Sequence, residues 1–292
     1  MFKTSSQDNY QKIYNQDLIL ATKYHFVVQK VRDFFLSRGF IEVPTQSRRS
    51  ILAACEDPKT IQTYTFENTH WPLPQTGQMW LEYELLTNPQ AKGFFCISTS
   101  YRQEPNPIPE RHKTIFPMFE FETHGGLNVL AQLEKDLIIH MNLAESYDDI
   151  KSISYLEAAK FYGVTELSSI EENNMYNDFG KTLLLESFPI ETSPFWNMKM
   201  NPNEKTAKKI DVILGGQETI GSAERATDKQ EMKELFYTIS NGEYANILFK
   251  QFGKERVEKE LFEYLSLDFF ERCGGGIGIT RLIQALEKEN IL

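Results

Sequence analysis

The chain has 292 residues, 41% of them hydrophobic and 13% aromatic, a composition that supplies a large globular core and excludes an intrinsically disordered protein. Its formal net charge of −10, from 41 acidic and 31 basic residues, creates no overall positive field that would attract nucleic acid. No apolar run approaches the ~20 residues of a membrane span, and residues 1–16 are polar and lack a signal sequence, so a cytoplasmic location and no membrane partner are expected.

The predicted strands lie mainly in the middle of the chain, with helices on either side. Apolar residues at helical spacing from Leu20 to Phe35 indicate a first helix, and Gly39 is a suitable C-terminal cap. Because strands and helices do not alternate regularly, we expect an α+β fold class with a mostly antiparallel sheet flanked by helices. In chain order, the prediction is helix 17–38, strand 40–43, a hairpin of strands 94–104 and 116–122, helices 127–145 and 155–162, strands 183–188, 195–200 and 210–214, and helices 228–239 and 253–265.

A single large domain is expected from residue 17 to residue 292, preceded by an N-terminal extension over residues 1–16. Residues 163–182 are polar and acidic, and we interpret them as a surface insertion in this domain.

The loop of the predicted hairpin carries a first group of candidate site residues. Arg102 and Arg111, with His112, could surround a polyphosphate, because a guanidinium offers a fixed fork of donors to phosphate oxygens. Glu104 could accept a hydrogen bond from an exocyclic amine, and Phe116 could stack on a purine. Spacing alone also fits a solvated hairpin with surface charges.

A glycine-rich run, 274–278, leads into a helix whose first turn contains Arg281. Glycines before a helix let the backbone approach a ligand and leave N–H donors at the helix start, although a purely structural turn has the same pattern. Asp211 and Glu218 stand on either side of a Gly-Gly turn, so both carboxylates could converge on a magnesium ion. They could equally be ordinary charges at strand ends.

Taken together and in this order, these blocks resemble the three signature motifs of class II aminoacyl-tRNA synthetases. Residues 38–44 resemble motif 1, residues 101–104 with 116–122 resemble motif 2, and residues 274–281 resemble motif 3. The resemblance covers roughly 17–292 and points to the catalytic fold of that class. Within it, the aspartate, asparagine and lysine branch, and especially the asparaginyl enzymes, is indicated by residues 55–56, 76–82, 194–196 and 211–225.

The resemblance implies an ATP-dependent ligase that activates aspartate or asparagine as an acyl-adenylate with the help of Mg²⁺. It also implies a role for each matching residue. Around the nucleotide, Arg102 would hold the α-phosphate and the reacting carboxylate, Glu104 would bind the adenine amine, Arg111 and His112 would bind the outer phosphates, Phe116 would cover one face of adenine, and Arg281 would cover the other face and bind the γ-phosphate. Asp211 and Glu218 would bind the magnesium ion. Around the amino acid, Glu56, Gln78 and Glu82 would surround the substrate ammonium, and Arg225 would bind the side-chain carboxylate or carboxamide.

Two features depart from the family pattern. Leu81 and Glu82 stand where aspartyl enzymes place lysine and glutamine, which favours recognition of asparagine. Thr280 replaces the acidic residue that usually precedes the arginine of motif 3. In addition, the motif 1 helix is predicted to begin near Asp17, so we expect the anticodon-binding domain of this branch to be absent ahead of it.

The leading hypothesis is therefore a synthetase-derived asparagine synthetase, which activates aspartate and passes it to ammonia. One alternative is asparaginyl transfer to tRNA, or to another acceptor, with RNA contacts supplied by a partner. Another is a non-catalytic sensor of nucleotides or amino acids. The resemblance further implies a homodimer in which the face of the first helix from Tyr24 to Phe35 is buried between subunits.

Overall fold

The computed structural model describes residues 19–45, 50–53, 57–103, 113–192, 194–201 and 203–292. The N-terminal extension proposed for residues 1–16 lies outside this part of the chain. The helices and strands are α2 (Ala21–Ser37), β1 (Ile41–Glu42), β2 (Thr63–Phe66), β3 (Thr69–Pro72), α3 (Gln78–Thr87), β4 (Gly93–Tyr101), β5 (Ile115–His124), α4 (Leu127–His140), β6 (Lys151–Ser154), α5 (Tyr155–Tyr162), α6 (Ser169–Asp178), β7 (Thr182–Pro189), β8 (Met200–Asn201), β9 (Thr206–Leu214), β10 (Gln217–Glu224), α7 (Lys229–Thr238), α8 (Glu243–Phe252), α9 (Lys254–Leu265), β11 (Arg272–Gly278) and α10 (Ile279–Lys288).

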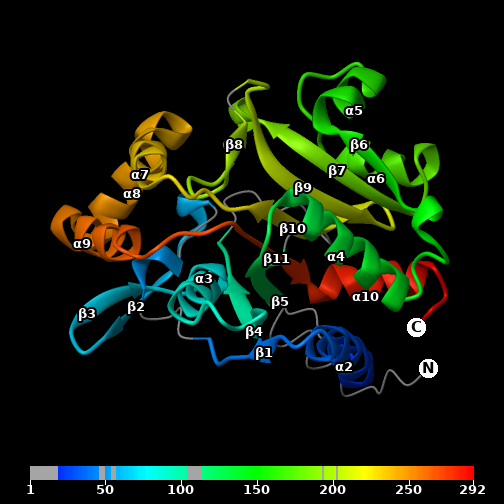
Figure 1. The fold of residues 1–292 in the computed structure, drawn as a ribbon, viewed down its shortest axis with the longest axis horizontal. Helices are drawn as coiled ribbons and strands as arrows, with labels where there is room; N and C mark the ends of the chain where they lie inside the picture. The colour runs from blue at the N-terminus through cyan, green and yellow to red at the C-terminus, as the bar shows by residue number, and fades with distance from the viewer. Residues whose placement is uncertain (1–18, 46–49, 54–56, 104–112, 193, 202) are drawn as a thin grey trace.

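A large sheet organises the described residues (Figure 1). Its strand order is β1-β4-β5-β11-β10-β9-β7-β6, and β8 pairs with β9. The pairs β1–β4 and β6–β7 are parallel, whereas the strands between them pair antiparallel. The predicted α+β class, with a mostly antiparallel sheet flanked by helices, is confirmed.

One face of the sheet is covered by α2, α4 and α10, which share the largest hydrophobic cluster with the strands. In α2, residues at helical spacing such as Val27, Val31 and Phe35 are fully buried, and the ring of Phe35 stacks on that of Phe119 from β5. The predicted burial of this α2 face between subunits is therefore wrong, because the same side chains are already buried inside the chain.

Among the described residues, the helices on the opposite face of the sheet pack on its two ends. At the β4 end, α3 packs on the strands through Leu81 and Leu85, next to a second cluster that α7, α8 and α9 help to form. At the β7 end, α5 and α6 pack through Tyr155 and Met175 on residues such as Ile213. The middle strands β5, β11 and β10 remain between these two groups, and they form the floor of the candidate site.

One prediction of local structure needs correction, and two helices were missed. Residues 195–200 do not form a strand: only Met200 joins β8, because Trp196 is fully buried among the rings of Phe236 and Tyr264. Helices α3 and α8 were not predicted at all. The segment 163–182 stays a predicted surface insertion; it contains helix α6, which is anchored by the buried side chain of Met175.

The glycine-rich run is also not the turn that the sequence suggested. Residues 272–278 form strand β11, which pairs with β5 on one side and β10 on the other. Its backbone groups are consequently engaged in the sheet and do not form a free phosphate-binding loop. Among the helices that the structure describes, none has the combination of length and apolar character that crossing a bilayer requires.

Candidate active site

A cavity of about 280 Å³ lies over the middle strands. Its walls combine acidic and aromatic side chains of β5 and β10 with cationic side chains of α10 and of the segments that follow β4 and precede β5, and glycines of β11 complete the lining. The lining residues are Gln75, Thr76, Gln78, Arg102, Lys113, Phe116, Met118, Glu120, Glu218, Thr219, Gly221, Gly276, Gly278, Thr280, Arg281 and Gln284. Arg102 and Arg281, which are 179 residues apart in the sequence, thus face one common cavity.

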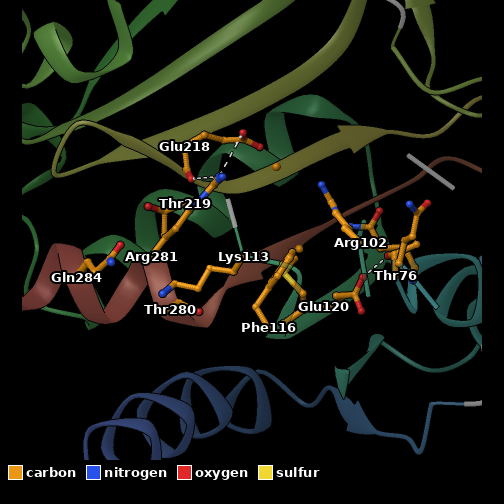
Figure 2. A pocket seen from close by; sticks show the side chains of 16 residues that line it. Thr76, Arg102, Lys113, Phe116, Glu120, Glu218, Thr219, Thr280, Arg281 and Gln284 are labelled. Atoms are coloured by element: carbon orange, nitrogen blue, oxygen red, sulfur yellow. Dashed lines mark hydrogen bonds and ion pairs between the residues drawn. The ribbon is translucent and has the colours of Figure 1, made fainter. Parts of the chain in front are cut away.

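One end of the cavity is formed by the start of α10 (Figure 2). Arg281 is held there because its Nη1 donates to the backbone oxygen of Glu218 at 2.7 Å and lies 3.5 Å from the Glu218 carboxylate. Lys113 and Gln284 line the same end. Phe116 lies between this end and Arg102, whose guanidinium carbon is 5.6 Å from the centre of the Phe116 ring.

Asp211 and Glu218 approach each other on the hairpin of β9 and β10. Gly221 lies opposite Asp211 in the ladder, and a Cβ at this position would stand 3.0 Å from Glu218 Oε1 and 3.6 Å from Asp211 Oδ1. Only glycine therefore leaves the space between these two oxygens open. Asp211 Oδ1 is buried and has no hydrogen-bond partner, whereas Oδ2 accepts from Lys209 at 2.8 Å.

This arrangement fits a divalent cation that is shared with a substrate. Burial, helped by the Glu218 carboxylate and opposed by Lys209, raises the pKa of Asp211 to about 7. A bound dication would reverse that shift by favouring the ionised form. Within the described residues, no three acidic, histidine or cysteine side chains are grouped so as to hold a metal by themselves. Mg²⁺ commonly takes one or two carboxylates and completes its shell with phosphate oxygens and water.

Helix α6 brings a further carboxylate to this hairpin. The backbone N–H of Glu218 donates to Glu172 at 3.4 Å, and Glu172 also contributes to the raised pKa of Asp211. Helix α6 packs closely against the β9–β10 turn at Gly216, because a Cβ at this position would stand 3.2 Å from the backbone of Asn173. The φ of +88° at Gly216 also favours glycine. Segment 163–182 is thus part of the wall behind the candidate metal site.

The other end of the cavity is built around Glu120. Its carboxylate accepts hydrogen bonds from the Thr76 and Ser98 hydroxyls and from the Gly77 N–H, the last at 2.8 Å. These donors fix the carboxylate. The Glu120 and Gln78 side chains both lie over Gly276, because a Cβ at this glycine would stand 3.4 Å from Gln78 Nε2 and 3.5 Å from Glu120 Cγ. An acidic group held in this way at a cavity wall can receive an ammonium group.

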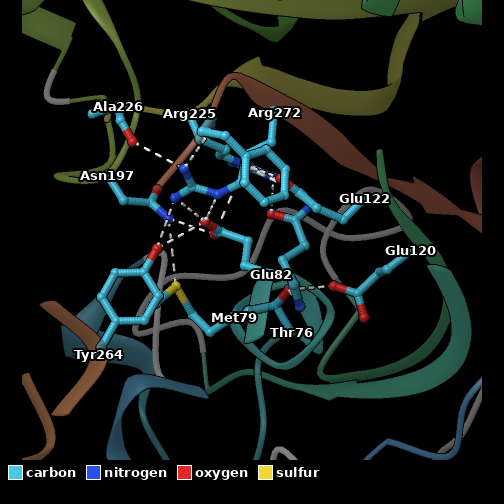
Figure 3. Close-up of polar contacts among 12 residues, drawn as sticks. Thr76, Met79, Glu82, Glu120, Glu122, Asn197, Arg225, Ala226, Tyr264 and Arg272 are labelled. Carbon is cyan, nitrogen blue, oxygen red and sulfur yellow. Dashed lines mark hydrogen bonds and ion pairs between the residues drawn. The ribbon is translucent and has the colours of Figure 1, made fainter. Parts of the chain in front are cut away.

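Gln78 contacts a buried ionic cluster through Arg225, and Figure 3 shows the charged side chains of this cluster. Arg225 is 2% exposed and donates through Nε and Nη2 to Glu122, at 3.1 to 3.4 Å, and through Nη2 to Gln78 Oε1 at 3.2 Å. Arg272 is fully buried and donates to Glu82 through Nε at 2.9 Å and Nη2 at 2.6 Å. We refer to Arg225, Arg272, Glu82 and Glu122 as the four-charge cluster.

Neutral groups complete the coordination of Glu82. Its Oε1 accepts from Asn197 at 2.6 Å, and its Oε2 accepts from the Tyr264 hydroxyl at 2.8 Å. Glu82 is 0% exposed and does not line the cavity. The prediction that Glu82 surrounds a substrate ammonium therefore needs correction, because its oxygens are already occupied by side chains of the protein.

The glycines of β11 make room for this cluster. A Cβ at Gly274 would lie 2.0 Å from Glu122 Oε2 and 2.3 Å from the backbone oxygen of Phe121, far inside van der Waals contact. Glycine at this position lets the Glu122 carboxylate lie over the strand and reach Arg225. The glycine run therefore shapes the site through close packing and not through a turn.

Eight of the twelve residues selected from the sequence are described, and Glu82 among them lies deepest, within the four-charge cluster. Arg102, Phe116, Glu218, Arg281 and Gln78 line the cavity, while Asp211 and Arg225 lie directly behind its wall. Glu56, Glu104, Arg111 and His112 lie outside the described residues.

Sequence reasoning missed Glu120, Glu122 and Arg272. The first two stand two residues apart in a predicted strand, and this spacing places both carboxylates on one face of the sheet. For Arg272 no local signal existed, since its partner Glu82 is 190 residues away.

The fold and this constellation define a class of protein. A family model described as tRNA synthetases class II (D, K and N) matches residues 5–291, and the chain belongs to that family. The fold agrees: asparaginyl-tRNA synthetase from Pyrococcus horikoshii, complexed with asparaginyl-adenylate, superposes with a TM-score of 0.73 at 19% identity, covering 91% of this chain and 64% of that one. The asparaginyl-tRNA synthetase of Entamoeba histolytica, also with asparaginyl-adenylate, gives a TM-score of 0.71 at 18% identity, covering 92% and 64%.

Sequence relatives belong to both the asparagine and the aspartate enzymes. The chain is 25% identical to an asparagine–tRNA ligase of Koribacter versatilis (strain Ellin345), over 88% of this chain and 62% of that protein. It is 21% identical to the cytoplasmic aspartate–tRNA ligase of Mus musculus, over 86% and 54%. The chain thus spans little more than half the length of these relatives.

Proposed function

We propose that this protein uses ATP to convert an amino acid of the aspartate and asparagine pair into an aminoacyl-adenylate, with release of pyrophosphate. The observation that carries the proposal is the common cavity of Arg102, Phe116, Glu218 and Arg281. A cavity with a cation at each end, an aromatic ring between them and a carboxylate pair at one wall suits a nucleoside triphosphate beside a small zwitterion.

The chemistry needs no nucleophile from the protein. An oxygen of the substrate carboxylate attacks the α-phosphorus of ATP, the bond from that phosphorus to the bridging oxygen breaks, and pyrophosphate leaves. Arg102 is the cation near the amino-acid end, so we assign it to the α-phosphate and the attacking carboxylate. Phe116 would stack on adenine, and Arg281 would neutralise charge on the nucleotide from α10. Positioning and fixed charges then supply the rate acceleration.

Asp211 and Glu218 are the residues that would hold Mg²⁺ in this proposal. When bound, the ion neutralises phosphate charge and orients the pyrophosphate leaving group. The residues of the chain prepare this site in three ways: Lys209 donates to the Asp211 carboxylate, Glu172 accepts from the Glu218 backbone N–H, and Gly221 leaves the space between the two carboxylates open.

At the amino-acid end, Glu120 and Gln78 would bind the substrate ammonium, the role that was predicted for Glu56, Gln78 and Glu82. The Glu120 carboxylate, fixed by three donors, would receive the substrate ammonium. Arg225 stands behind Gln78 and would approach the substrate side chain.

The acyl acceptor separates two finer hypotheses. The asparagine synthetase hypothesis requires aspartate as substrate and predicts ammonia-dependent formation of asparagine. The aminoacyl-transfer hypothesis is supported by the asparagine–tRNA ligase relative and predicts charging of tRNA or another acceptor with asparagine.

The homodimer also remains part of the proposal, although with another interface than predicted. Exposed apolar side chains of α2 and β1, namely Phe26, Leu36 and Ile41, are 45%, 46% and 48% exposed and are available to a second subunit. Light scattering at micromolar concentration should give twice the chain mass, and a monomer would refute this element.

The test of the adenylation proposal is exchange of labelled pyrophosphate into ATP in the presence of each of the twenty amino acids. We expect exchange that depends on asparagine or aspartate and on Mg²⁺. The Arg102→Ala variant should lose the exchange at least ~100-fold while its unfolding temperature stays unchanged. Exchange without any amino acid, or full activity of Arg102→Ala, would overturn the assignment. No exchange with any amino acid would favour the sensor hypothesis.

A further inference from the structure

Helix α9 carries a polar face that contacts a much earlier part of the chain. Arg256 and Glu260 are four residues apart in this helix, so their side chains lie on the same face. Figure 1 places α9 beside the ribbon of β2 and β3, and a hydrogen bond from Arg256 joins the two elements. Each of these two side chains fixes a different segment next to the amino-acid end of the cavity.

Arg256 fixes strand β3. Its Nη1 donates to the backbone oxygen of His70 at 2.6 Å, and its guanidinium carbon lies 4.2 Å from the centre of the Trp71 ring. Strand β3 ends at Pro72, and the chain runs from there into residues 75–78, most of which line the cavity. We refer to residues 75–78 as the amino-acid wall. Arg256 therefore holds the backbone that leads directly into this wall.

Glu260 fixes the short 3₁₀ helix η2 (Ile51–Ala53). Its Oε2 accepts from the Ile51 backbone N–H at 2.8 Å and from the Ser50 hydroxyl at 3.0 Å. Helix η2 packs in turn on β3 and on α3, whose first residue is the cavity-lining Gln78. Glu260 thus holds a segment on which both ends of the amino-acid wall rest.

The wall has a third connection through Gln75. This side chain is 1% exposed, and its Nε2 donates to the Asp57 backbone oxygen at 3.0 Å and to the Thr60 hydroxyl at 2.5 Å. Both acceptors belong to the 3₁₀ helix η3 (Pro58–Thr60) and its N-cap, and η3 packs on α8. Through β3, η2 and η3, the amino-acid wall is therefore connected to α8 and α9.

We infer that Arg256 and Glu260 are positioning residues for the amino-acid substrate, because they hold the amino-acid wall in the arrangement that receives the substrate ammonium. This inference rests on the proposed adenylation and adds two residues that do not line the cavity. Both act through β3 and η2, whereas Phe116 and Arg281, which we assign to the nucleotide, come from β5 and α10. Loss of Arg256 or Glu260 should consequently weaken binding of the amino acid and not of ATP.

The first experiment measures the KM for ATP and for asparagine and aspartate in pyrophosphate exchange. Arg256→Met removes the donor to His70 but keeps an aliphatic stem beside Trp71, and Glu260→Ala removes the acceptor for Ile51. Each variant should raise the KM for the amino acid at least ~10-fold, since a misplacement of about 1 Å costs up to ~100-fold, and should leave the KM for ATP unchanged. Glu260→Gln keeps an acceptor oxygen and should restore the KM for the amino acid.

Glu258→Ala is the matched control on another face of the same helix. Glu258 accepts from the Tyr237 hydroxyl at 3.0 Å, a contact between α9 and α7 that does not reach the amino-acid wall. This variant should leave both KM values unchanged. If Arg256→Met and Glu260→Ala lower the unfolding temperature as the control does and leave the KM for the amino acid unchanged, their role is structural only and the inference is wrong. An equal rise of both KM values would also contradict it.

Hydrogen–deuterium exchange of residues 73–81 tests the inference without catalytic activity. The Leu73 N–H is bonded to the backbone oxygen of Gln62, and the Gly77 N–H to the Glu120 carboxylate. These amides should exchange faster in Arg256→Met and in Glu260→Ala than in the wild type and the control.

The two proposals fail in different ways. Faster hydrogen exchange in both variants of a protein that catalyses no pyrophosphate exchange would refute adenylation and keep the link from α9 to the wall. Unchanged hydrogen exchange in both variants would refute the positioning role and leave adenylation intact. If Glu260→Ala does not fold, Arg256→Met still supports both measurements, because Arg256 is only half-buried.

Discussion

The position most sensitive to a single methyl group is Gly274, and its replacement by alanine probes how the site is built. The added Cβ would lie 2.0 Å from Glu122 Oε2 and 2.3 Å from the Phe121 backbone oxygen. The backbone contact cannot be relieved by a side-chain rotation, so β5 and β11 must separate or Glu122 must leave Arg225. Overpacking of this kind costs about 1–3 kcal/mol, and disturbing a buried ion pair adds several more.

We therefore expect Gly274→Ala to lose about 3 kcal/mol or more of unfolding free energy in a urea titration. Gly278→Ala is the matched control on the same strand: its φ of −71° suits alanine, and the nearest atom to its Cβ would be 3.7 Å away. This control should stay within about 1 kcal/mol of the wild type. If both variants unfold at the same urea concentration, the close packing of Glu122 over β11 is not present and the cluster geometry is wrong.

The remaining predictions concern a buried acid, the adenine contact and the metal. Glu134 on α4 is 1% exposed, and burial raises its pKa to about 8 although the Ser222 hydroxyl opposes the shift. Because the folded state holds this proton and the unfolded state releases it near its ordinary pKa, stability falls as pH rises from about 4.5 to 8. Glu134→Gln should remove about 1.4 kcal/mol per pH unit of that fall between pH 5.5 and 7.5, measured by urea unfolding, and parallel pH profiles would refute it. Phe116→Ala should raise the KM for ATP roughly tenfold in pyrophosphate exchange and leave the KM for the amino acid unchanged; an unchanged KM for ATP would place adenine elsewhere. Glu218→Gln should weaken Mn²⁺ binding in the presence of ATP at least ~10-fold in paramagnetic resonance titrations, and wild-type affinity would remove Glu218 from the metal site.

Long amphipathic helices could be predicted from the sequence, because the spacing of their apolar residues determines which face of the helix is buried. The helix expected at 17–38 is α2 (Ala21–Ser37), and those expected at 228–239 and 253–265 are α7 and α9. In each, the apolar residues at helical spacing are the ones buried. The cavity was also partly predictable, since Arg102 and Arg281 were selected through motif patterns and line it together.

Other features depend on contacts between distant parts of the chain. The glycine run has no side chains that could reveal a two-residue alternation, so nothing local distinguishes β11 from a turn. Trp196 lies in a stretch that reads as a strand but is drawn into an aromatic cluster with Phe236 and Tyr264. The role of Glu82 was misassigned for the same reason, because its partner Arg272 comes from β11.

The most direct test of the central claim is a crystal structure of the protein with a sulfamoyl analogue of asparaginyl-adenylate. We predict that Phe116 and Arg281 enclose the adenine, that Arg102 contacts the sulfamoyl group that replaces the α-phosphate, and that Gln78, backed by Arg225, lies nearest the amino-acid side chain. A nucleotide bound outside this cavity, or contacted by only one of Arg102 and Arg281, would contradict the assignment of the site.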